Sequence, residues 1–288
     1  MPAIYAYAPG KVILTGEHAV VYGRPAIAVP VHEVRVRAAI QANPTDSKGT
    51  VHILAPDISL DTVLNDMPAD HPMSIIFREV QKELGIEHLP ALTLTVTSTI
   101  PIAAGLGSGA AISVAISRVL SSFLGAPLPE ESISRIAFET DHFYHGTPSG
   151  IDNTVISYGR MVFFIRGKPI EMLANPLAFT LVIADSGKKS LTGKVVHDLR
   201  TRVEIDPARY QAIFDRSEII SRSAREAIEQ GDHTRLGTLL SDNHFLLQQL
   251  AVSTAHLDLL VKTAMEAGAL GAKLSGAGCG GNIIALVD

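Results

Sequence analysis

The chain has 288 residues, of which 47% are hydrophobic, and a mean hydropathy of +0.25, so it can bury one large core or two ordinary ones. A net charge of -5 and a pI near 6.1 provide no general attraction for nucleic acid or an anionic membrane. The single cysteine excludes an internal disulfide, no apolar stretch approaches the roughly 20 residues of a membrane span, and the N-terminus lacks a signal-peptide pattern. We therefore expect a soluble protein of the cytoplasm.

The first hundred residues are predicted to form short strands and one helix. Strands are predicted at 4–8, 26–29 and 33–41, with breaks at Pro9-Gly10 and Gly23-Arg24-Pro25. A helix is predicted over 74–84, with Ser74 as its cap and Gly85 as its stop. Apolar residues alternate with threonines over 92–97, which predicts a half-buried strand that ends at Pro101.

Helices dominate the rest of the chain. The predicted elements are helices at 108–124 and 130–144, a loop at 146–150, a strand-rich stretch at 154–166, a strand at 179–184, helices at 207–230, 234–250 and 255–267, and strands at 271–274 and 282–287. Strands and helices are mixed without strict alternation, which favours an α+β fold over a doubly wound sheet. The pattern changes near residue 175, so we expect two domains, 1–175 and 176–288.

The strongest local feature is a glycine loop between a predicted strand and a predicted helix, Pro101-Ile-Ala-Ala-Gly-Leu-Gly-Ser-Gly-Ala-Ala111. Glycines let backbone N–H groups approach an anion, and the N-terminus of a helix adds partial positive charge. The loop therefore predicts phosphate binding. Two alternatives stay open: a dinucleotide fingerprint, Gly105-x-Gly107-x-x-Ala110 with Glu130 as the ribose acid, and a tight turn without a ligand.

A second glycine-punctuated segment, Pro9 to Gly23, places a lysine, an acid, a histidine and a tyrosine within twelve positions. Phosphoryl transfer requires charge neutralisation and alignment, and Lys11 supplies a positive charge. The three other side chains are of types that can hold a hydroxy acid. The alternative is a solvated lysine and a histidine that belongs to the core.

A third glycine segment, Lys273-Leu-Ser-Gly-Ala-Gly-Cys-Gly-Gly281, precedes a predicted strand. Its Gly276-x-Gly278-x-x-Gly281 also matches the dinucleotide pattern, which requires a helix after the glycines. Because 282–287 has the pattern of a strand, the sequence argues against a Rossmann-type oxidoreductase.

These three segments, in this order and spacing, resemble the three signature motifs of the GHMP kinases, and the likeness covers essentially the whole chain. Three segments resemble the mevalonate kinases in particular: Gly16-Glu-His-Ala-Val-Val-Tyr-Gly23, His145-Gly-Thr-Pro-Ser-Gly-Ile-Asp-Asn153 and Val252-Ser-Thr-Ala-His-Leu-Asp258. The resemblance implies a ribosomal S5 domain 2-like N-terminal domain, a ferredoxin-like C-terminal domain, and ATP bound without a Walker loop. It also implies phosphorylation of mevalonate to 5-phosphomevalonate in isoprenoid precursor biosynthesis, with ATP as co-substrate and Mg²⁺ as cofactor.

The resemblance also implies roles for single residues. Asp152, expected in a loop, corresponds to the catalytic aspartate that accepts the proton of the substrate hydroxyl, and Lys11 lowers the pKa of that hydroxyl. The residues implied for mevalonate binding are Glu17, His18, Tyr22 and Thr192, the last at the start of a helix; His18 is implied for the carboxylate or the hydroxyl. The residues implied for ATP binding are Pro101, Ala104, Gly105, Leu106, Gly107, Ser108, Gly109, Ala110, Ser275, Gly276, Ala277 and Gly278.

The implied magnesium site departs from the family pattern. The family has two serines after its second glycine, and here Gly109 replaces the second, which leaves Ser108 as a metal ligand or as a helix cap. The family's other ligand is a glutamate, and its position is occupied by Asp141, one methylene shorter. Helical spacing places Asp141 at the edge of the inward face of its helix, where an acid needs a partner such as Mg²⁺.

Two further interpretations stay open. A sister GHMP enzyme, such as a phosphomevalonate or homoserine kinase, would keep the loops but change the residues around His18 and Thr192. A catalytically silent sensor of the same fold is suggested by the two departures at the metal site and opposed by Lys11 and Asp152. The sequence is also compatible with a homodimer.

Overall fold

The structure is a computed structural model that describes residues 3–101, 104–145, 148–173 and 178–288, without the side chains of 144 and 145. The strands are β1 (Ile4–Thr15), β2 (Ala26–Ala42), β3 (Val51–Ala55), β4 (Leu60–Val63), β5 (Leu92–Ser98), β6 (Val162–Phe164), β7 (Glu171–Met172), β8 (Thr180–Asp185), β9 (Gly271–Ser275) and β10 (Asn282–Val287). The α-helices are α1 (Pro72–Leu84), α2 (Ser108–Phe123), α3 (Glu130–His145), α4 (Ile151–Tyr158), α5 (Thr192–Ile205), α6 (Pro207–Gln230), α7 (His233–Gln249) and α8 (Ala255–Glu266), and short 3-10 helices are η1 (Ala19–Tyr22), η2 (Pro56–Ile58) and η3 (Leu64–Asp66). This content confirms the α+β class.

The chain packs into two compact units, each built from several segments. The first unit holds the described residues of Met1–Gly10, Pro30–Pro101 and Gly107–Gly159, and the second those of Lys11–Val29, Ile102–Leu106 and Arg160–Asp288. Strands β1 and β2 therefore contribute residues to both units. These units each contain several segments of the chain, so they do not test a single boundary along the sequence. The domain boundary at residue 175 stays a prediction.

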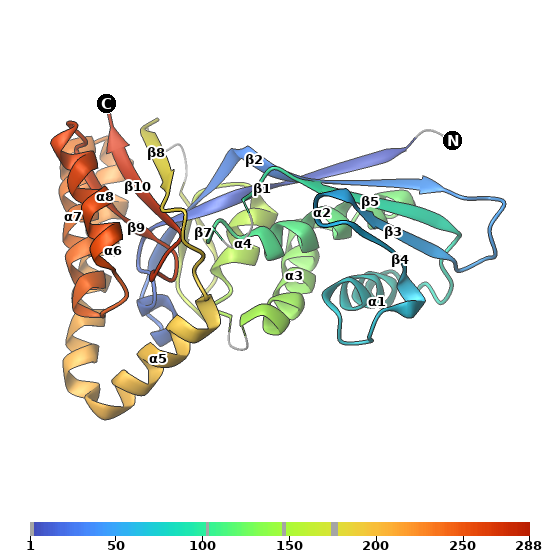
Figure 1. The fold of residues 1–288 in the computed structure, drawn as a ribbon, viewed down its shortest axis with the longest axis horizontal. Coiled ribbons are helices and arrows are strands. Elements are labelled where there is room, and N and C mark those ends of the chain that lie inside the picture. Colours follow the sequence, from blue (N-terminus) through green and yellow to red (C-terminus); the bar gives the residue numbers. More distant parts are fainter. Residues whose placement is uncertain (1–2, 102–103, 146–147, 174–177) are drawn as a thin grey trace. The chain divides into compact units, whose positions relative to one another are not determined.

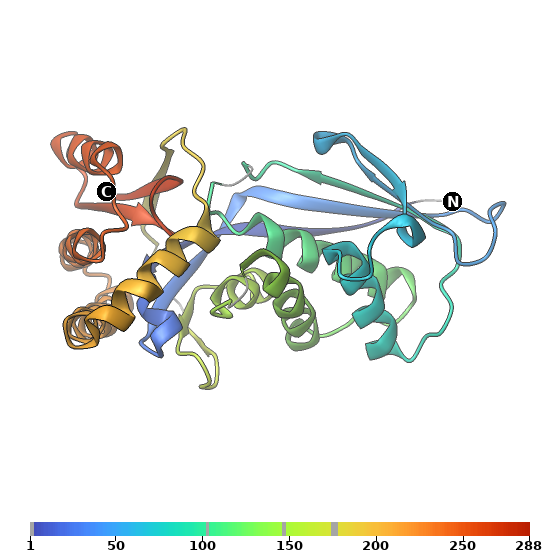
Figure 2. The same cartoon turned by 60° about the horizontal axis from the view of Figure 1, so that its bottom comes forward.

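In the first unit, β5 pairs antiparallel with β2 and parallel with β3, and β3 pairs antiparallel with β4. The predicted alternation of β5 is confirmed, since its leucines and valine are buried while its threonines are partly exposed. Figure 2 shows helices α1, α2 and α3, coloured cyan to green, on one face of these strands. Helix α2, whose only charged residue is Arg118, carries buried residues around most of its circumference.

The N-terminal strands are longer than predicted. Strand β1 continues through Pro9 and Gly10 to Thr15, and β2 joins two predicted strands into one of 17 residues. A proline is compatible with a strand wherever its missing N–H is not required by the ladder, so it is a weaker break than the prediction assumed. Helix α1 is capped by His71, whose ring accepts a hydrogen bond from the Met73 N–H, and not by Ser74.

The strand-rich stretch predicted over 154–166 is wrong in its first half, where the chain forms helix α4. Two side-chain contacts hold this helix. Asn153 Nδ2 donates to the backbone carbonyl of Ser134 at 3.0 Å and lies 2.9 Å from its hydroxyl, and Thr154 Oγ1 donates to the Gly150 carbonyl at 2.6 Å. Tertiary contacts of this kind override a local β-propensity.

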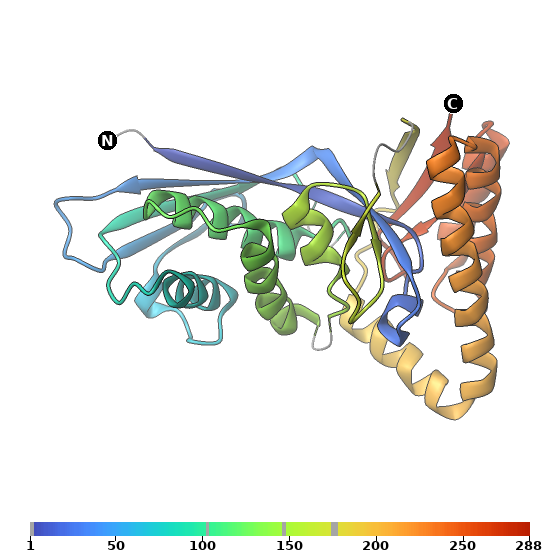
Figure 3. The same ribbon diagram turned by 180° about the vertical axis from the view of Figure 1, so that it is seen from behind.

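In the second unit, the three strands of a small antiparallel sheet lie in the order β8-β10-β9. Helices α7 and α8 pack against this sheet and α6 packs against α7, an arrangement seen in Figures 1 and 3. Strand β2 pairs with β6 in the same unit, and β6 pairs with β7. The strands and helices predicted after residue 179 are confirmed to within one or two residues.

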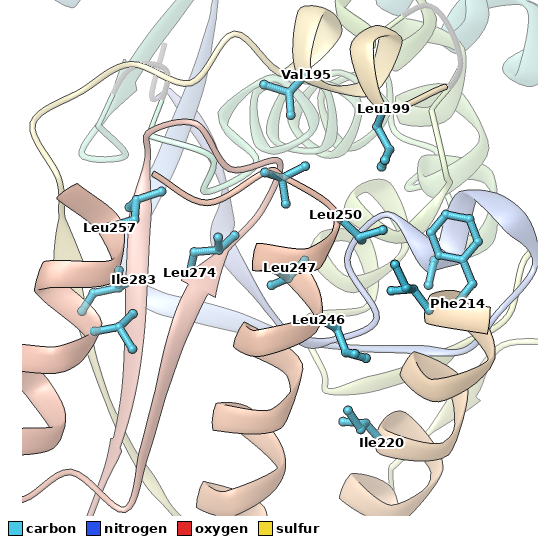
Figure 4. Packing of buried hydrophobic residues seen from close by; sticks show 14 of the residues in the cluster. Val195, Leu199, Phe214, Ile220, Leu246, Leu247, Leu250, Leu257, Leu274 and Ile283 are labelled. Atoms are coloured by element: carbon cyan, nitrogen blue, oxygen red, sulfur yellow. The ribbon is translucent and has the colours of Figure 1, made fainter. Parts of the chain in front are cut away.

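One apolar cluster fills the space between these helices and the sheet, as Figure 4 shows. Phe214 on α6 is completely buried in it, and the ring of Tyr22 stacks on Phe214 with centroids 4.4 Å apart. Ala19, from the first segment of the chain, belongs to the same cluster. Among the described residues, no helix is both long and apolar enough to cross a bilayer.

Candidate active site

The third glycine segment connects the antiparallel strands β9 and β10. The strand predicted after its glycines is therefore confirmed, and the segment offers no helix N-terminus for a dinucleotide. Gly278 has φ of 84°, and a Cβ there would overlap the carbonyl oxygen of Val252. The backbone N–H of Cys279 donates to the same carbonyl at 2.7 Å, so this loop has one well-defined path.

Parts of all three glycine segments meet inside the second unit. Asn282 Nδ2 donates to the carbonyl of Ala104, and a Cβ on Gly276 would lie 3.6 Å from the carbonyl oxygen of Gly105. The backbone N–H of Lys11 donates to the carbonyl of Leu106 at 3.0 Å. Residues 102 and 103 of the first loop lie outside the described residues, as do 146 and 147 of the segment before Asp152. The segments that resemble separate motifs thus form one backbone framework.

The polar side chains of residues 11–17 are buried here. Lys11 is only 4% exposed and Glu17 only 2%. The ammonium of Lys273, on β9, donates to Oε1 of Glu17 and, at 3.3 Å, to the carbonyl of Ile13. Ser275 Oγ lies 3.0 Å from the Ile13 N–H, which donates to it, and 3.2 Å from the Ile13 carbonyl. Strand β9 is therefore tied by two side chains to the end of β1.

Burial and charge act in opposite directions on this ion pair. Burial raises the pKa of Glu17, and the nearby Lys273 ammonium opposes that rise, with a smaller contribution from Lys11. Burial likewise lowers the pKa of Lys273, and the Glu17 carboxylate opposes that fall. Burial therefore disfavours the charged form of each side chain, and the opposite charge of its partner favours that form.

His18 has an unusual backbone and a neutral ring. Its φ of 61° and ψ of -46°, with the Ala19 N–H donating to the Glu17 carbonyl at 2.6 Å, define a γ-turn centred on His18. Its Nε2 lies 2.9 Å from the carbonyl of Ala277. A carbonyl only accepts, so Nε2 carries the proton. Burial lowers the pKa of His18 to about 4, so the ring is neutral at pH 7.

The other two residues implied for mevalonate binding have different surroundings. The ring of Tyr22 is partly buried against Phe214, and burial raises the pKa of its hydroxyl. Thr192 is half-buried at the first position of α5, as expected. The structure therefore places Tyr22 against the apolar core and Thr192 at a helix N-terminus.

The remaining part of the predicted phosphate loop belongs to the first unit. Gly107 has φ of 76° and forms the N-cap of α2, and no side chain caps this helix. Ser108 and Gly109 are half-buried in its first turn, Ala110 is buried, and Pro101 is exposed. The first N–H groups of a helix have no partners within it, and the helix dipole favours an anion there. This arrangement can bind a phosphate.

The two candidate acids also belong to the first unit. Asp152 is half-buried in the first turn of α4, so its predicted place in a loop is wrong. Asp141 on α3 is 2% exposed, which is deeper than the edge position predicted for it. Its neighbour Thr140 shares a 2.6 Å hydrogen bond with Ser113, and Ser113 donates to the Gly109 carbonyl at 3.1 Å. The helix of Asp141 is thereby tied to the first turn of α2.

The donors of the implied magnesium site are chemically suitable. Mg²⁺ prefers oxygen ligands and is bound in kinases by one or two protein groups together with phosphates. The carboxylate of Asp141 and the hydroxyl of Ser108 are oxygen donors, and a buried carboxylate gains from a cation. In the described part of the chain, no three His, Cys, Asp or Glu side chains form a metal cluster by themselves.

Lys273 is the functional candidate that sequence reasoning did not assign. It stands in an apolar strand, Gly271–Ser275, directly before the third glycine loop. A charged residue within a short apolar strand was the available signal, but its partner Glu17 lies 256 positions away. Asn282 and Asn153 were also missed as anchors of the glycine loop and of α4.

Comparison with known proteins gives one consistent result. The model of the GHMP kinase N-terminal domain matches residues 73–160, and that of the GHMP kinase C-terminal domain matches 224–288. The chain is 34% identical to a mevalonate kinase of Pyrococcus horikoshii, over 98% of this chain and 88% of the relative, and 35% identical to one of Aeropyrum pernix, over 99% and 88%. A crystal structure of L. major mevalonate kinase in complex with R-mevalonate has a TM-score of 0.83 and 31% identity, covering 99% of this chain and 87% of that one.

Proposed function

The chain belongs to the GHMP kinases, and from this premise we propose that it transfers the γ-phosphate of ATP to mevalonate, a step of isoprenoid precursor biosynthesis. The observation that carries the proposal is the similarity to mevalonate kinases over nearly the full length of both chains. The convergence of the three glycine segments on one framework supports phosphate binding at the positions that the family motifs imply.

We propose a division of tasks among the residues of this chain. Phosphoryl transfer depends mainly on positioning and on electrostatic stabilisation. Asp152 accepts the proton of the substrate hydroxyl, and Lys11 stabilises negative charge on the transferring group. Two separate elements are proposed to bind phosphate through backbone N–H groups: the first turn of α2 in the first unit, and the loop at 275–278 in the second. His18, with a neutral ring, contributes to the binding of the hydroxy acid.

We further propose that Asp141 and Ser108 hold Mg²⁺ together with the phosphates. The buried carboxylate of Asp141 and the tie between its helix and the first turn of α2 support this assignment. A cation held by these two oxygen donors would supply positive charge that offsets the negative charge of the phosphates.

The proposal is tested by measuring ADP release with a coupled assay against mevalonate, phosphomevalonate, homoserine and galactose. We expect kcat/KM for mevalonate to exceed that for the other three by orders of magnitude. A preference for another alcohol would identify a sister enzyme. Release of no ADP with any of them, while ATP still binds, would favour a silent sensor.

Two further properties complete the proposal. We propose a cytoplasmic location, which the single cysteine and the proposed substrate support, and fractionation of cells tests it. A homodimer stays a prediction, which light scattering of the purified protein tests.

A further inference from the structure

Lys273 is a charged side chain with no exposed surface. Its contacts are Oε1 of Glu17 and the carbonyl of Ile13. The other carboxylate oxygen of Glu17, Oε2, is buried and has no hydrogen-bond partner in the described part of the chain. A buried ion pair stabilises a fold only when its remaining lone pairs are satisfied, and an apolar pair of similar volume is often as stable. A contribution to stability is therefore a weak explanation for this pair.

The pair lies beside a turn of unusual shape. A γ-turn with positive φ at a residue other than glycine is strained and persists only where its surroundings hold it. On one side, a Cβ at Gly16 would overlap Pro25 and Ala26, so the backbone there is closely confined. On the other side, Ala277 accepts from the His18 ring. Glu17, between these two points, is held by Lys273.

Strand β9 provides both halves of this support. Lys273 and Ser275 are two positions apart and so project from the same face of the strand. Ser275 binds the backbone of Ile13, before the turn, and Lys273 binds Ile13 and Glu17, within it. The strand that leads into the third glycine loop thus sets the conformation of the turn that presents His18.

We propose that Lys273 is a positioning residue for mevalonate: it acts through Glu17 to hold the turn that orients His18 and does not touch the substrate itself. Glu17 is then the counterion of Lys273 and not a direct ligand of the hydroxy acid. The inference rests on the proposed function for the identity of the substrate. Its structural part, the dependence of the His18 turn on the ion pair, does not.

The first test is Lys273→Met, which keeps the length of the side chain and removes its charge. We expect KM for mevalonate to rise at least about tenfold while KM for ATP stays within about threefold. The matched control is Ile283→Ala on β10, which removes buried apolar atoms on the other face of the sheet (Figure 4) and should lower the melting temperature without changing KM for mevalonate. Equal changes in both KM values, or the same KM change in the control, would overturn the proposal.

A double-mutant cycle tests whether Lys273 acts through His18. In a His18→Asn background, Lys273→Met should raise KM for mevalonate by less than about twofold, because the residue that it positions is already replaced. Asparagine tolerates a positive φ and keeps an N–H donor for Ala277, so this background should fold. Effects that multiply fully in the double variant would contradict the proposal.

A third variant covers the case in which Lys273→Met does not fold, since it leaves the Glu17 carboxylate buried alone. Glu17→Gln with Lys273→Met removes both charges. It should fold and still show the raised KM for mevalonate, and a wild-type KM would overturn the proposal.

A crystal structure of this double variant tests the positioning role without an activity assay. We expect the His18 ring to have left the Ala277 carbonyl, and an unchanged turn would refute the positioning role even if mevalonate proved not to be the substrate.

Discussion

Acidification should destabilise this protein through His18. Burial lowers the pKa of the folded His18 to about 4, whereas an unfolded histidine titrates near 6.5. Between these values the unfolded state binds a proton that the folded state does not. The stability contributed by the neutral ring is therefore fully present above pH 6.5 and is lost as the pH falls toward 4.

The size of the effect follows from the two pKa values. Lowering the pH from 7 to 5 should cost about 2 kcal/mol of unfolding free energy through this residue alone. That is a large part of the roughly 5–15 kcal/mol that stabilises an ordinary domain. His244 contributes as well, because burial also lowers its pKa. A variant that removes only the titration of His18 is therefore needed.

His18→Asn is that variant, since asparagine does not titrate, tolerates a positive φ and can donate to Ala277. The chain has no tryptophan, so urea unfolding is best followed by circular dichroism at pH 7 and pH 5. The wild type should lose about 2 kcal/mol more than His18→Asn between these two conditions. Equal losses in the two proteins, or a His18 ring that titrates near pH 6.5 by NMR, would refute the reasoning.

Three other predictions test the remaining assignments. Asp152→Asn should lower kcat by about 10²–10⁴-fold and leave the affinity for ATP within a few-fold, and retention of more than about a tenth of the wild-type kcat would exclude it as the base. Asp141→Ala should raise the Mg²⁺ concentration that gives half-maximal rate and should lower kcat. The double variant Asp141→Glu with Gly109→Ser should retain activity. An unchanged Mg²⁺ titration in Asp141→Ala would contradict the role of Asp141 as a metal ligand. Phe214→Ala should lower the free energy of unfolding in urea by about 3–5 kcal/mol, because it leaves a cavity in the core and removes the ring that stacks on Tyr22. A decrease below about 1 kcal/mol would contradict the packing described.

Local patterns were sufficient for most of the elements. Helix α2 was predictable because it follows a glycine turn and has Arg118 as its only charged residue, and β5 because apolar residues alternate with threonines. Helix α4 was not, because its residues include β-branched side chains and its stability comes from the contact between Asn153 and Ser134 on another helix. The continuation of β1 through Pro9 likewise depends on its place in the sheet and not on its own sequence.

The candidate site divides in the same way. The glycine segments are visible in the sequence because glycine tolerates positive φ and close approach, and the structure uses both properties at Gly278. The ion pair between Glu17 and Lys273 was not predictable, because no local spacing connects residues 256 positions apart. The neutral state of His18 depends on burial by the fold, which its neighbours in sequence do not indicate.

Glu17 and Lys273 are far apart in the sequence, so they are synthesised at different times. At about 5–20 residues per second, the 256 residues from Glu17 to Lys273 take roughly 13–50 s to translate. During that time Ile13 lacks its contacts with β9, whereas β2, the strand that pairs with β1, is made early. Lys11 and Glu17 flank the apolar run Val12–Leu14, and charges in such positions act as gatekeepers against aggregation. We therefore expect Lys11 and Glu17, which are buried in the folded protein, to oppose aggregation of this run before β9 has been made.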